Sequence, residues 1–224
     1  MDIDELELVS KIEVKKDAAL IIVDLQNDFM PSGNLAVEEG DMIIEPINEL
    51  AMKFRLLDNV VIMTQDWHPS GHLSFASSHN MTPYEPYESE GIGPILWPDH
   101  CIQGTPGADS HPKVDLRFAN AIIRKGYHLN VDSYSTFIEN DGKTQTGLSG
   151  YLKALDKNRI FLCGLALDYC VYYSAKDGKN MGFETIVPID LSKSVNSPKD
   201  HLSNTLNHMM KMGIKFVRSE DIIT

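Results

Sequence analysis

The stretch Ala-Ala-Leu-Ile-Ile-Val-Asp at residues 18–24 decides the fold of this chain. Its six consecutive apolar residues indicate a strand buried on both faces, which is how strands lie in parallel sheets covered by helices. Five further runs of this kind predict strands of the same sheet. They lie at residues 59–65, 121–123, 159–164, 184–189 and 214–217.

Helical patterns alternate with these strands. Residues 41–54 carry apolar side chains at helical spacing, and Pro46 lies early enough to belong to the first turns. Further helices are predicted at residues 148–155, 168–181 and 197–211, the last one starting at Ser197-Pro198. The alternation predicts an α/β fold, with a mostly parallel, six-stranded, Rossmann-like sheet and helices on both faces. We expect one domain over residues 1–224, with residues 1–16 as a short N-terminal extension.

Composition narrows the class of protein. The chain has 224 residues, 42% of them hydrophobic, which is enough for a full core. Its net charge of −12 argues against a nucleic-acid backbone or an anionic membrane as the main partner. Three cysteines are an odd number, so a reducing compartment is favoured over a disulfide scaffold, and Cys101 and Cys163 are expected to pack as structural residues. No apolar run reaches about 18 residues, so no membrane span is predicted and the cytoplasm is the expected location.

Three reactive side chains stand at the ends of predicted strands. Asp24 ends the first strand, Lys125 follows the third, and Cys170 lies at the start of the helix after the fourth. Because the carboxyl ends of parallel strands share one edge of a sheet, these side chains are expected to meet there. A thiol at a helix N-terminus is expected to have a lowered pKa. It could attack a carbonyl carbon while Asp24 accepts its proton.

Each of these residues also has a plainer interpretation. Cys170 could be a buried structural cysteine, which is the commoner role of a free thiol. Asp24 could cap the turn that follows it, although Asp28 suits that role better. Lys125, or its neighbour Arg124, could be a surface cation, and the sequence does not choose between the two.

A second group of residues suggests a metal site. Asp66 and His68 are two residues apart at a strand end, so an extended backbone points both to the same side. His100 could supply a third ligand from the long irregular segment at residues 66–117, and a segment of that length is usually functional. Such ligands suit Zn²⁺, Fe²⁺ or Mn²⁺ and leave positions open for water or substrate. The alternative is a turn with an exposed histidine. Exposure is the expectation for His72, His79, His111, His128, His201 and His208.

Taken in order, these motifs resemble the metal-dependent nicotinamidase branch of the isochorismatase-like cysteine hydrolase family. The resemblance covers residues 17–220. It rests on residues 22–37, on Thr-Gln-Asp-Trp-His-Pro at 64–69, and on the block at 97–108 that begins Trp-Pro-Asp-His-Cys. It implies a catalytic triad, a set of metal ligands, aromatic walls of a ring pocket, and a non-proline cis peptide whose N–H helps to bind an oxyanion. The triad of the family matches Asp24, Lys125 and Cys170, and its metal ligands match Asp66, His68 and His100. The aromatic walls match Phe29, Trp97 and Tyr134, and the cis peptide matches Leu165–Ala166.

The resemblance implies an amidohydrolase that converts nicotinamide to nicotinate and ammonia through a cysteine thioester, as a step of NAD salvage. It implies one divalent metal ion, Zn²⁺ before Fe²⁺ or Mn²⁺, and leaves homo-oligomer formation and activity on pyrazinamide open. The chain departs from the family pattern at Leu167, where threonine is usual. It also has a longer segment at residues 72–96, which we expect at the pocket rim or in an oligomer contact.

Two rival functions fit the same residues. An enzyme of this family could act on a different amide, which a panel of aliphatic amides would reveal. A protein that kept only the fold could bind metal without catalysis, and its Cys170 would be alkylated slowly at neutral pH. Cleavage of a vinyl ether, as by an isochorismatase, needs no thiol nucleophile, so Cys170 argues against that reaction.

Overall fold

The computed structural model describes residues 3–224, and all six predicted strands are present in it. β3 and β4 are buried along their whole length, as expected of central strands that are covered on both faces. The strands are β3 (Ala18–Val23), β4 (Val60–Asp66), β5 (Ala121–Lys125), β6 (Arg159–Leu165), β7 (Glu184–Pro188) and β9 (Lys215–Val217).

The main sheet within the described residues has eight strands, so the prediction of six was wrong in number although right in class. The two additional strands are β1 (Leu8–Val9) and β8 (Ser192–Lys193). A strand of two residues has no alternation to read, and it exists only because a neighbour pairs with it. A separate pair joins β2 (Ile12–Glu13) to β10 (Ile222–Ile223), so the N-terminal extension packs on the domain.

The strand order of the main sheet is β1-β9-β7-β6-β3-β4-β5, with β8 beside β6, and the pairings are parallel. β3 therefore lies at the centre, between β4 on one side and β6 on the other. The chain first builds the sheet outward from β3 through β4 to β5. It then returns to the opposite side of β3 and continues through β6, β7 and β9.

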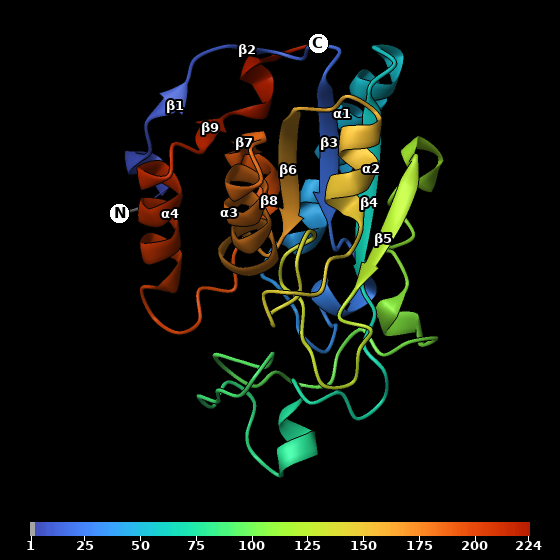
Figure 1. The fold of residues 1–224 in the computed structure, drawn as a ribbon, viewed down its shortest axis with the longest axis vertical. Coiled ribbons are helices and arrows are strands. Elements are labelled where there is room, and N and C mark those ends of the chain that lie inside the picture. Colours follow the sequence, from blue (N-terminus) through green and yellow to red (C-terminus); the bar gives the residue numbers. More distant parts are fainter. Residues whose placement is uncertain (1–2) are drawn as a thin grey trace.

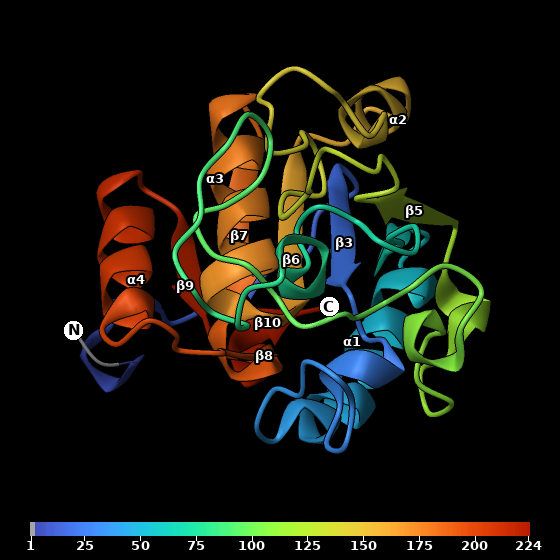
Figure 2. The same ribbon diagram turned by 90° about the horizontal axis from the view of Figure 1, so that it is seen from below.

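Helices cover both faces of this sheet, as predicted. Figure 2 shows α1 on one side of the strands and α2 and α3 on the other, and α4 lies beside α3 (Figure 1). The helices are α1 (Ile44–Leu56), α2 (Leu148–Ala154), α3 (Tyr172–Asn180) and α4 (His201–Lys211). Pro46 lies in the first turn of α1, where its missing N–H leaves no hydrogen bond unmade.

Two predicted helix starts were wrong. Residues Leu167–Val171 form a π-helical turn, and the regular helix α3 begins only at Tyr172. The last helix begins at His201 and not at Ser197, because Asp200 adopts a left-handed backbone (φ 67°) that breaks the helical path before it. The Ser197–Pro198 bond is cis.

The long segment between β4 and β5 contains 3-10 turns and isolated bridges but no long helix or strand, as its composition suggested. It hangs beyond the carboxyl ends of the strands, drawn in teal and green (Figure 1), and crosses in front of them in the view from below (Figure 2). The segment therefore covers the edge of the sheet where Asp24, Lys125 and Cys170 lie. The 3-10 turns within it are Ala76–His79, Pro106–Ala108 and Leu116–Phe118.

In the part of the chain that the structure describes, no helix combines the length and apolar character needed to cross a membrane.

Candidate active site

The site lies where the order of strands reverses. The chain leaves β3 toward β4 and later returns to the other side of β3 as β6, and open α/β sheets bind ligands in the crevice outside such a reversal. Asp24 follows β3, Lys125 is the last residue of β5, and Cys170 follows β6. The tertiary structure brings these three residues together at the carboxyl edge, as predicted.

Lys125 is the centre of the cluster. Its side chain is fully buried, and its Nζ lies 2.9 Å from Asp24 Oδ2 and 3.4 Å from Cys170 Sγ. The same Nζ also donates a short hydrogen bond to Asp66 and one of 2.9 Å to the Ser133 carbonyl. Burial opposes the charge on Lys125, but Asp24, Asp66 and the thiol outweigh it and raise the pKa well above its usual value. The surface-cation interpretation of Lys125 is wrong.

Asp24 is fully buried, so its carboxylate needs hydrogen-bonding or charged partners. The Thr64 hydroxyl donates to Asp24 Oδ1 over 2.6 Å, and Lys125 faces the other oxygen. Burial raises the pKa of Asp24, with Lys125 and Thr64 opposing the shift. A carboxylate with a raised pKa is a better proton acceptor than one that is fully solvated.

Cys170 lies in the π-helical turn and is 7% exposed. Burial, together with Asp24 and Asp66, raises the pKa of the Cys170 thiol well above its usual value, although Lys125 opposes this shift. The expected lowering of the pKa by the helix N-terminus was wrong, because the turn is buried beside two carboxylates. A thiol in this setting needs a base to become a nucleophile. Cys101 and Cys163 are buried and free, as expected of structural cysteines.

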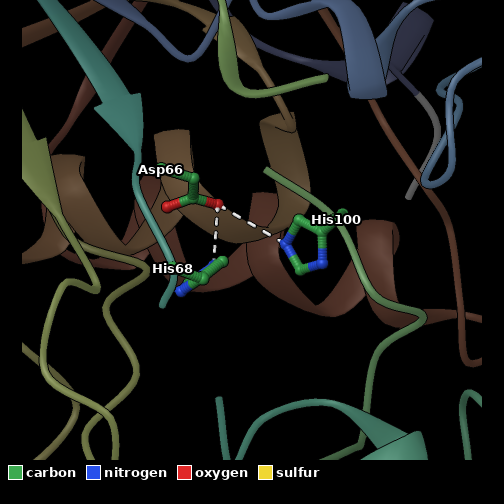
Figure 3. Close-up of side chains that lie close together, drawn as sticks. All are labelled: Asp66, His68 and His100. Atoms are coloured by element: carbon green, nitrogen blue, oxygen red, sulfur yellow. Dashed lines mark ion pairs between the residues drawn. The ribbon is translucent and has the colours of Figure 1, made fainter. Parts of the chain in front are cut away.

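Asp66, His68 and His100 lie together at the end of β4 (Figure 3). The Nε2 atoms of both histidines are 3.7 Å from Asp66 Oδ2, and the possible ligand atoms of the three residues lie within 4.8 Å of one another. Lys125 and the two histidines overcome the effect of burial and hold the pKa of Asp66 well below its usual range, so this carboxylate is ionised.

The donor set fits a divalent metal ion. His68 Nδ1 lies 2.9 Å from the Gly126 carbonyl, and His100 Nδ1 lies 2.8 Å from the Pro98 carbonyl. A carbonyl only accepts, so each Nδ1 is the donor of this bond, and Nε2, on the side of Asp66, is the ring atom available to a metal ion. This arrangement of a carboxylate and two oriented imidazoles is typical of a metal site whose outer hydrogen bonds fix the ligands.

A small pocket joins the two groups of residues. This pocket is bounded by polar side chains of both groups and by aromatic rings. Trp97 Nε1 donates to the Tyr134 hydroxyl over 2.9 Å, which fixes the two rings at 84° to each other. The lining residues are Phe29, Leu35, Asp66, Trp97, His100, Asp132, Tyr134, Ala166, Tyr169, Cys170 and Val195. The three aromatic residues expected at the pocket all line it.

The Leu165–Ala166 peptide is cis, as the resemblance implied, and Ala166 lines the same pocket as Cys170. Leu167 is fully buried in the core. Within the longer segment at residues 72–96, the Tyr84 ring packs edge-on against Trp97, with centroids 5.9 Å apart. This contact is consistent with the expectation that the segment lies at the pocket rim.

Sequence reasoning missed two buried polar residues at the site. Gln26 is fully buried, and its amide accepts from the Asp66 N–H and donates to the Asp66 carbonyl over 2.8 and 2.7 Å. Asp132 is 3% exposed and lines the pocket, and its Oδ2 has no hydrogen-bond partner among the described residues. Neither residue belongs to a spacing pattern, so only a comparison of related sequences could have found them.

His72 was expected to be exposed and is fully buried, which corrects that prediction. Its ring lies 4.5 Å from that of His68, and its Nδ1 and Nε2 are bonded to the Ser74 hydroxyl and the Val131 carbonyl. Burial lowers the pKa of His72 to about 4, so its ring is neutral and packs against His68.

Comparison with known proteins agrees with this geometry. The Isochorismatase domain matches residues 18–221. The chain belongs to the isochorismatase family. Among curated relatives in this family, the nicotinamidase of Acinetobacter baylyi is 41% identical over 214 residues, which are 95% of this chain and 98% of the relative.

Solved structures of family members show the same similarity. A nicotinamidase and pyrazinamidase of Acinetobacter baumanii has a TM-score of 0.88 at 42% identity, covering 92% of this chain and 98% of that one. The pyrazinamidase of Pyrococcus horikoshii in complex with zinc has a TM-score of 0.74 at 36% identity, covering 90% and 99%. Within the isochorismatase family, the chain is a hydrolase of the nicotinamidase group.

Proposed function

We propose that this enzyme hydrolyses nicotinamide to nicotinate and ammonia through a thioester on Cys170, with one divalent metal ion held by Asp66, His68 and His100. The observation that carries the proposal is the position of Lys125. One buried ammonium contacts the thiol, the proposed base Asp24 and the metal ligand Asp66. Thiol and metal ligands therefore belong to one site.

The substrate class follows from the pocket. Phe29, Trp97 and Tyr134 enclose a narrow space that suits a flat aromatic ring, and Cys170 and Ala166 stand at its wall. An aromatic amide would place its ring against the aromatic side chains and its carbonyl carbon near the thiol. The metal complex of the Pyrococcus horikoshii relative makes Zn²⁺ the first candidate for this chain. The product would re-enter NAD synthesis.

The first half of the reaction uses the thiol and its base. Oxygen and sulfur atoms of Asp24 and Cys170 lie within 4.8 Å of each other. The raised pKa of Asp24 makes it a better acceptor for the thiol proton, while the raised pKa of the Cys170 thiol means that the thiol needs such a base. The thiolate adds to the amide carbon, and the backbone N–H groups of Ala166 and Cys170 would stabilise the oxyanion. Asp24 returns the proton to the nitrogen, the C–N bond breaks, and ammonia leaves.

In the second half, water attacks the thioester carbon and Asp24 takes its proton, so that nicotinate and the free thiol are released. Lys125 keeps Asp24 oriented and its charge balanced in both halves. A bound divalent ion would supply a Lewis acid toward the ring nitrogen of the substrate or toward water. Asp66, His68 and His100 would hold that ion.

The first experiment measures ammonia release from nicotinamide by the purified protein, with and without a chelator. We expect rapid release that is lost on chelation and restored by Zn²⁺, Fe²⁺ or Mn²⁺. Absence of release with metal present would contradict the substrate assignment, and a panel of other heteroaryl and aliphatic amides would then identify the amide. Release that a chelator does not affect would contradict the metal assignment.

A Cys170→Ala substitution tests the nucleophile. We expect kcat for nicotinamide to fall by more than about a thousandfold, because the covalent path is removed, while the metal content stays unchanged. Cys163→Ala is the matched control, since Cys163 is fully buried in β6 away from Lys125, and it should retain activity. Activity that survives in Cys170→Ala would exclude the thioester.

A further inference from the structure

One wall of the pocket comes from a segment without regular structure. Val195 lines the cavity from residues 194–200, which connect β8 to α4 and which we call the strap. β8 pairs with β6 at Gly164 and Leu165, so the chain enters the strap directly beside the turn that carries Cys170. Pro198 and Asp200 at the end of the strap accept hydrogen bonds from the N–H groups of His201 and Asn204, so the position of the earlier residues depends on other contacts.

The turn that carries Cys170 holds the strap. Asp168 is fully buried, and its two carboxylate oxygens accept the N–H groups of Val195 and Asn196 over 3.0 and 2.7 Å. The Tyr169 hydroxyl donates to the Ser197 carbonyl over 2.5 Å. His201 Nε2 lies 3.0 Å from the Asp168 carbonyl, which closes the far end of the strap onto the same turn.

These contacts connect two sides of the pocket through one short piece of chain. Asp168 stands two residues before Cys170 in the π-helical turn Leu167–Val171. A carboxylate that accepts two successive backbone N–H groups fixes both the distance and the direction of the strap, because both oxygens are used. The side chain of Asp168 therefore ties Val195 to the turn that carries Cys170.

We propose that Asp168 is a positioning residue that holds Val195 against the pocket and thereby limits which ring substituents the site admits. The proposal rests on the proposed hydrolysis of a ring amide and adds the device that sets its specificity. Asp168 touches neither the thiol nor the substrate in this role. It acts through the strap.

Asp168→Asn is the informative substitution, since an amide offers one accepting oxygen and turns an NH₂ toward the second N–H. We expect KM for nicotinamide to rise by roughly tenfold while kcat changes by less than about threefold, because the pocket wall loosens and the thiol stays. Discrimination between nicotinamide and 5-methylnicotinamide, measured as the ratio of kcat/KM, should fall by about tenfold. A fall in kcat at constant KM and constant discrimination would overturn the proposal.

Two companions sharpen the test. Val195→Ala should lower the discrimination in the same way, and the double variant should add little, because both changes act on one wall. Asp190→Asn is the matched control. Asp190 also accepts two hydrogen bonds from one residue, the Ser219 N–H over 2.8 Å and hydroxyl over 2.5 Å, but it does not line the pocket. Asp190→Asn should leave KM and discrimination unchanged. If the effects of Asp168→Asn and Val195→Ala on discrimination were additive in the double variant, the two residues would not act on one wall.

A readout without turnover separates this proposal from the proposed function. We expect Asp168→Asn to increase alkylation of Cys170 by bulky N-ethylmaleimide relative to iodoacetamide by about tenfold, with the modified cysteine located by mass spectrometry. A wild-type protein that releases no ammonia from nicotinamide would refute the substrate, while a changed alkylation ratio would still support the strap. If Asp168→Asn does not fold, Tyr169→Phe removes only the bond to Ser197 and should change the same ratio. An unchanged ratio in the folded variants would overturn the proposal.

Discussion

Lys125 shows how much depends on single residues in this site. The sequence offered Lys125 and Arg124 as equal candidates for an exposed cation. In the structure Lys125 ends β5 with its side chain fully buried, while the Arg124 guanidinium lies over the Trp67 ring, 3.7 Å from its centre. Alternation along β5 turns one residue inward and its neighbour outward. A buried ammonium is stable there only because Asp24 and Asp66 balance its charge.

Gly126 is a second residue whose identity is required by its neighbours. It adopts a φ of +64°, and a Cβ on it would lie 2.6 Å from His68 Cε1. Its carbonyl also accepts the hydrogen bond that orients His68. We expect Gly126→Ala to lower metal affinity by about 10- to 100-fold, because the ring must move away from the ligand position. Titration with a chromogenic chelator measures this loss.

The control is Gly142→Ala, since Gly142 has a similar φ of +69° and nothing within 4 Å of an added Cβ. It carries the same backbone strain without the contact to His68. If both variants lost metal affinity to the same extent, backbone strain and not displacement of His68 would be responsible for the loss.

Among the elements, the turn between β6 and α3 contains several of the residues to which we assign a role. The same few residues include the cis peptide Leu165–Ala166, the proposed nucleophile Cys170 and the strap anchor Asp168. Burial of this turn also decides its electrostatics, since the pKa of the Cys170 thiol is raised there and not lowered. A sequence pattern can place a helix start, but it cannot tell how deeply that start is buried.

The strands of the sheet outside the site offer a test of electrostatic stabilisation. Glu184 on β7 lies 2.7 Å from Arg159 on β6 and 2.7 Å from Lys215 on β9, so one carboxylate connects three neighbouring strands. Burial would raise the pKa of Glu184, but Lys215 and Arg159 outweigh it and lower the pKa below its usual value of 4.5. A lowered carboxyl pKa adds stability above pH 4.5, and this stability is lost as the pH falls through the folded-state value.

Glu184→Gln should therefore reduce the free energy of unfolding at pH 7 by about 0.5–1 kcal/mol, since solvent reaches the Glu184 and Lys215 side chains and screens the pairs. The difference from the wild type should vanish at low pH, where the carboxylate is protonated in both the folded and the unfolded state. Urea unfolding at both pH values measures it. Glu90→Gln, which removes an exposed pair with Lys143, serves as control and should change stability at neither pH. A difference that is constant with pH would exclude the ionic origin.

At the scale of the whole molecule, the proposed metal ligands come both from the sheet and from the long segment that covers its carboxyl edge. Asp66 and His68 stand at the end of β4, while His100 comes from the long segment that covers the carboxyl edge (Figure 1). An ion held by all three residues would tie this segment to the sheet. Its binding free energy would then contribute to the stability of the entire domain, because the unfolded chain has no preformed site.

We expect removal of the metal by a chelator to lower the Tm by roughly 5–10 °C relative to protein with metal at about a hundred times its Kd. His68→Ala should melt at the same temperature with and without added Zn²⁺, because one ligand is lost. His208→Ala, an exposed histidine of α4, is the control and should respond to Zn²⁺ like the wild type. A metal-dependent Tm in His68→Ala would show that the ion binds elsewhere.

The sequence by itself determined the class of fold and several of the side chains that gather at the carboxyl edge of the sheet. A short unbroken apolar run such as residues 18–23, in alternation with helical segments, favours a central strand of a covered sheet, so the parallel sheet and its helices were predictable. Asp24, Asp66 and Cys170 were predictable as well, because each stands at the carboxyl end of a strand or just beyond it, and such ends share one edge. Local pattern and connectivity were enough for these conclusions.

Only the tertiary structure decided how these residues act on one another. The burial of Lys125 and His72, the raised pKa of the Cys170 thiol, the free oxygen of Asp132 and the hold of Asp168 on the strap all come from chain segments far apart in the sequence. β1 and β8 were missed for the same reason, since two residues form a strand only when a neighbour pairs with them. Burial and charge balance depend on what the rest of the fold places nearby, and no local pattern contains that information.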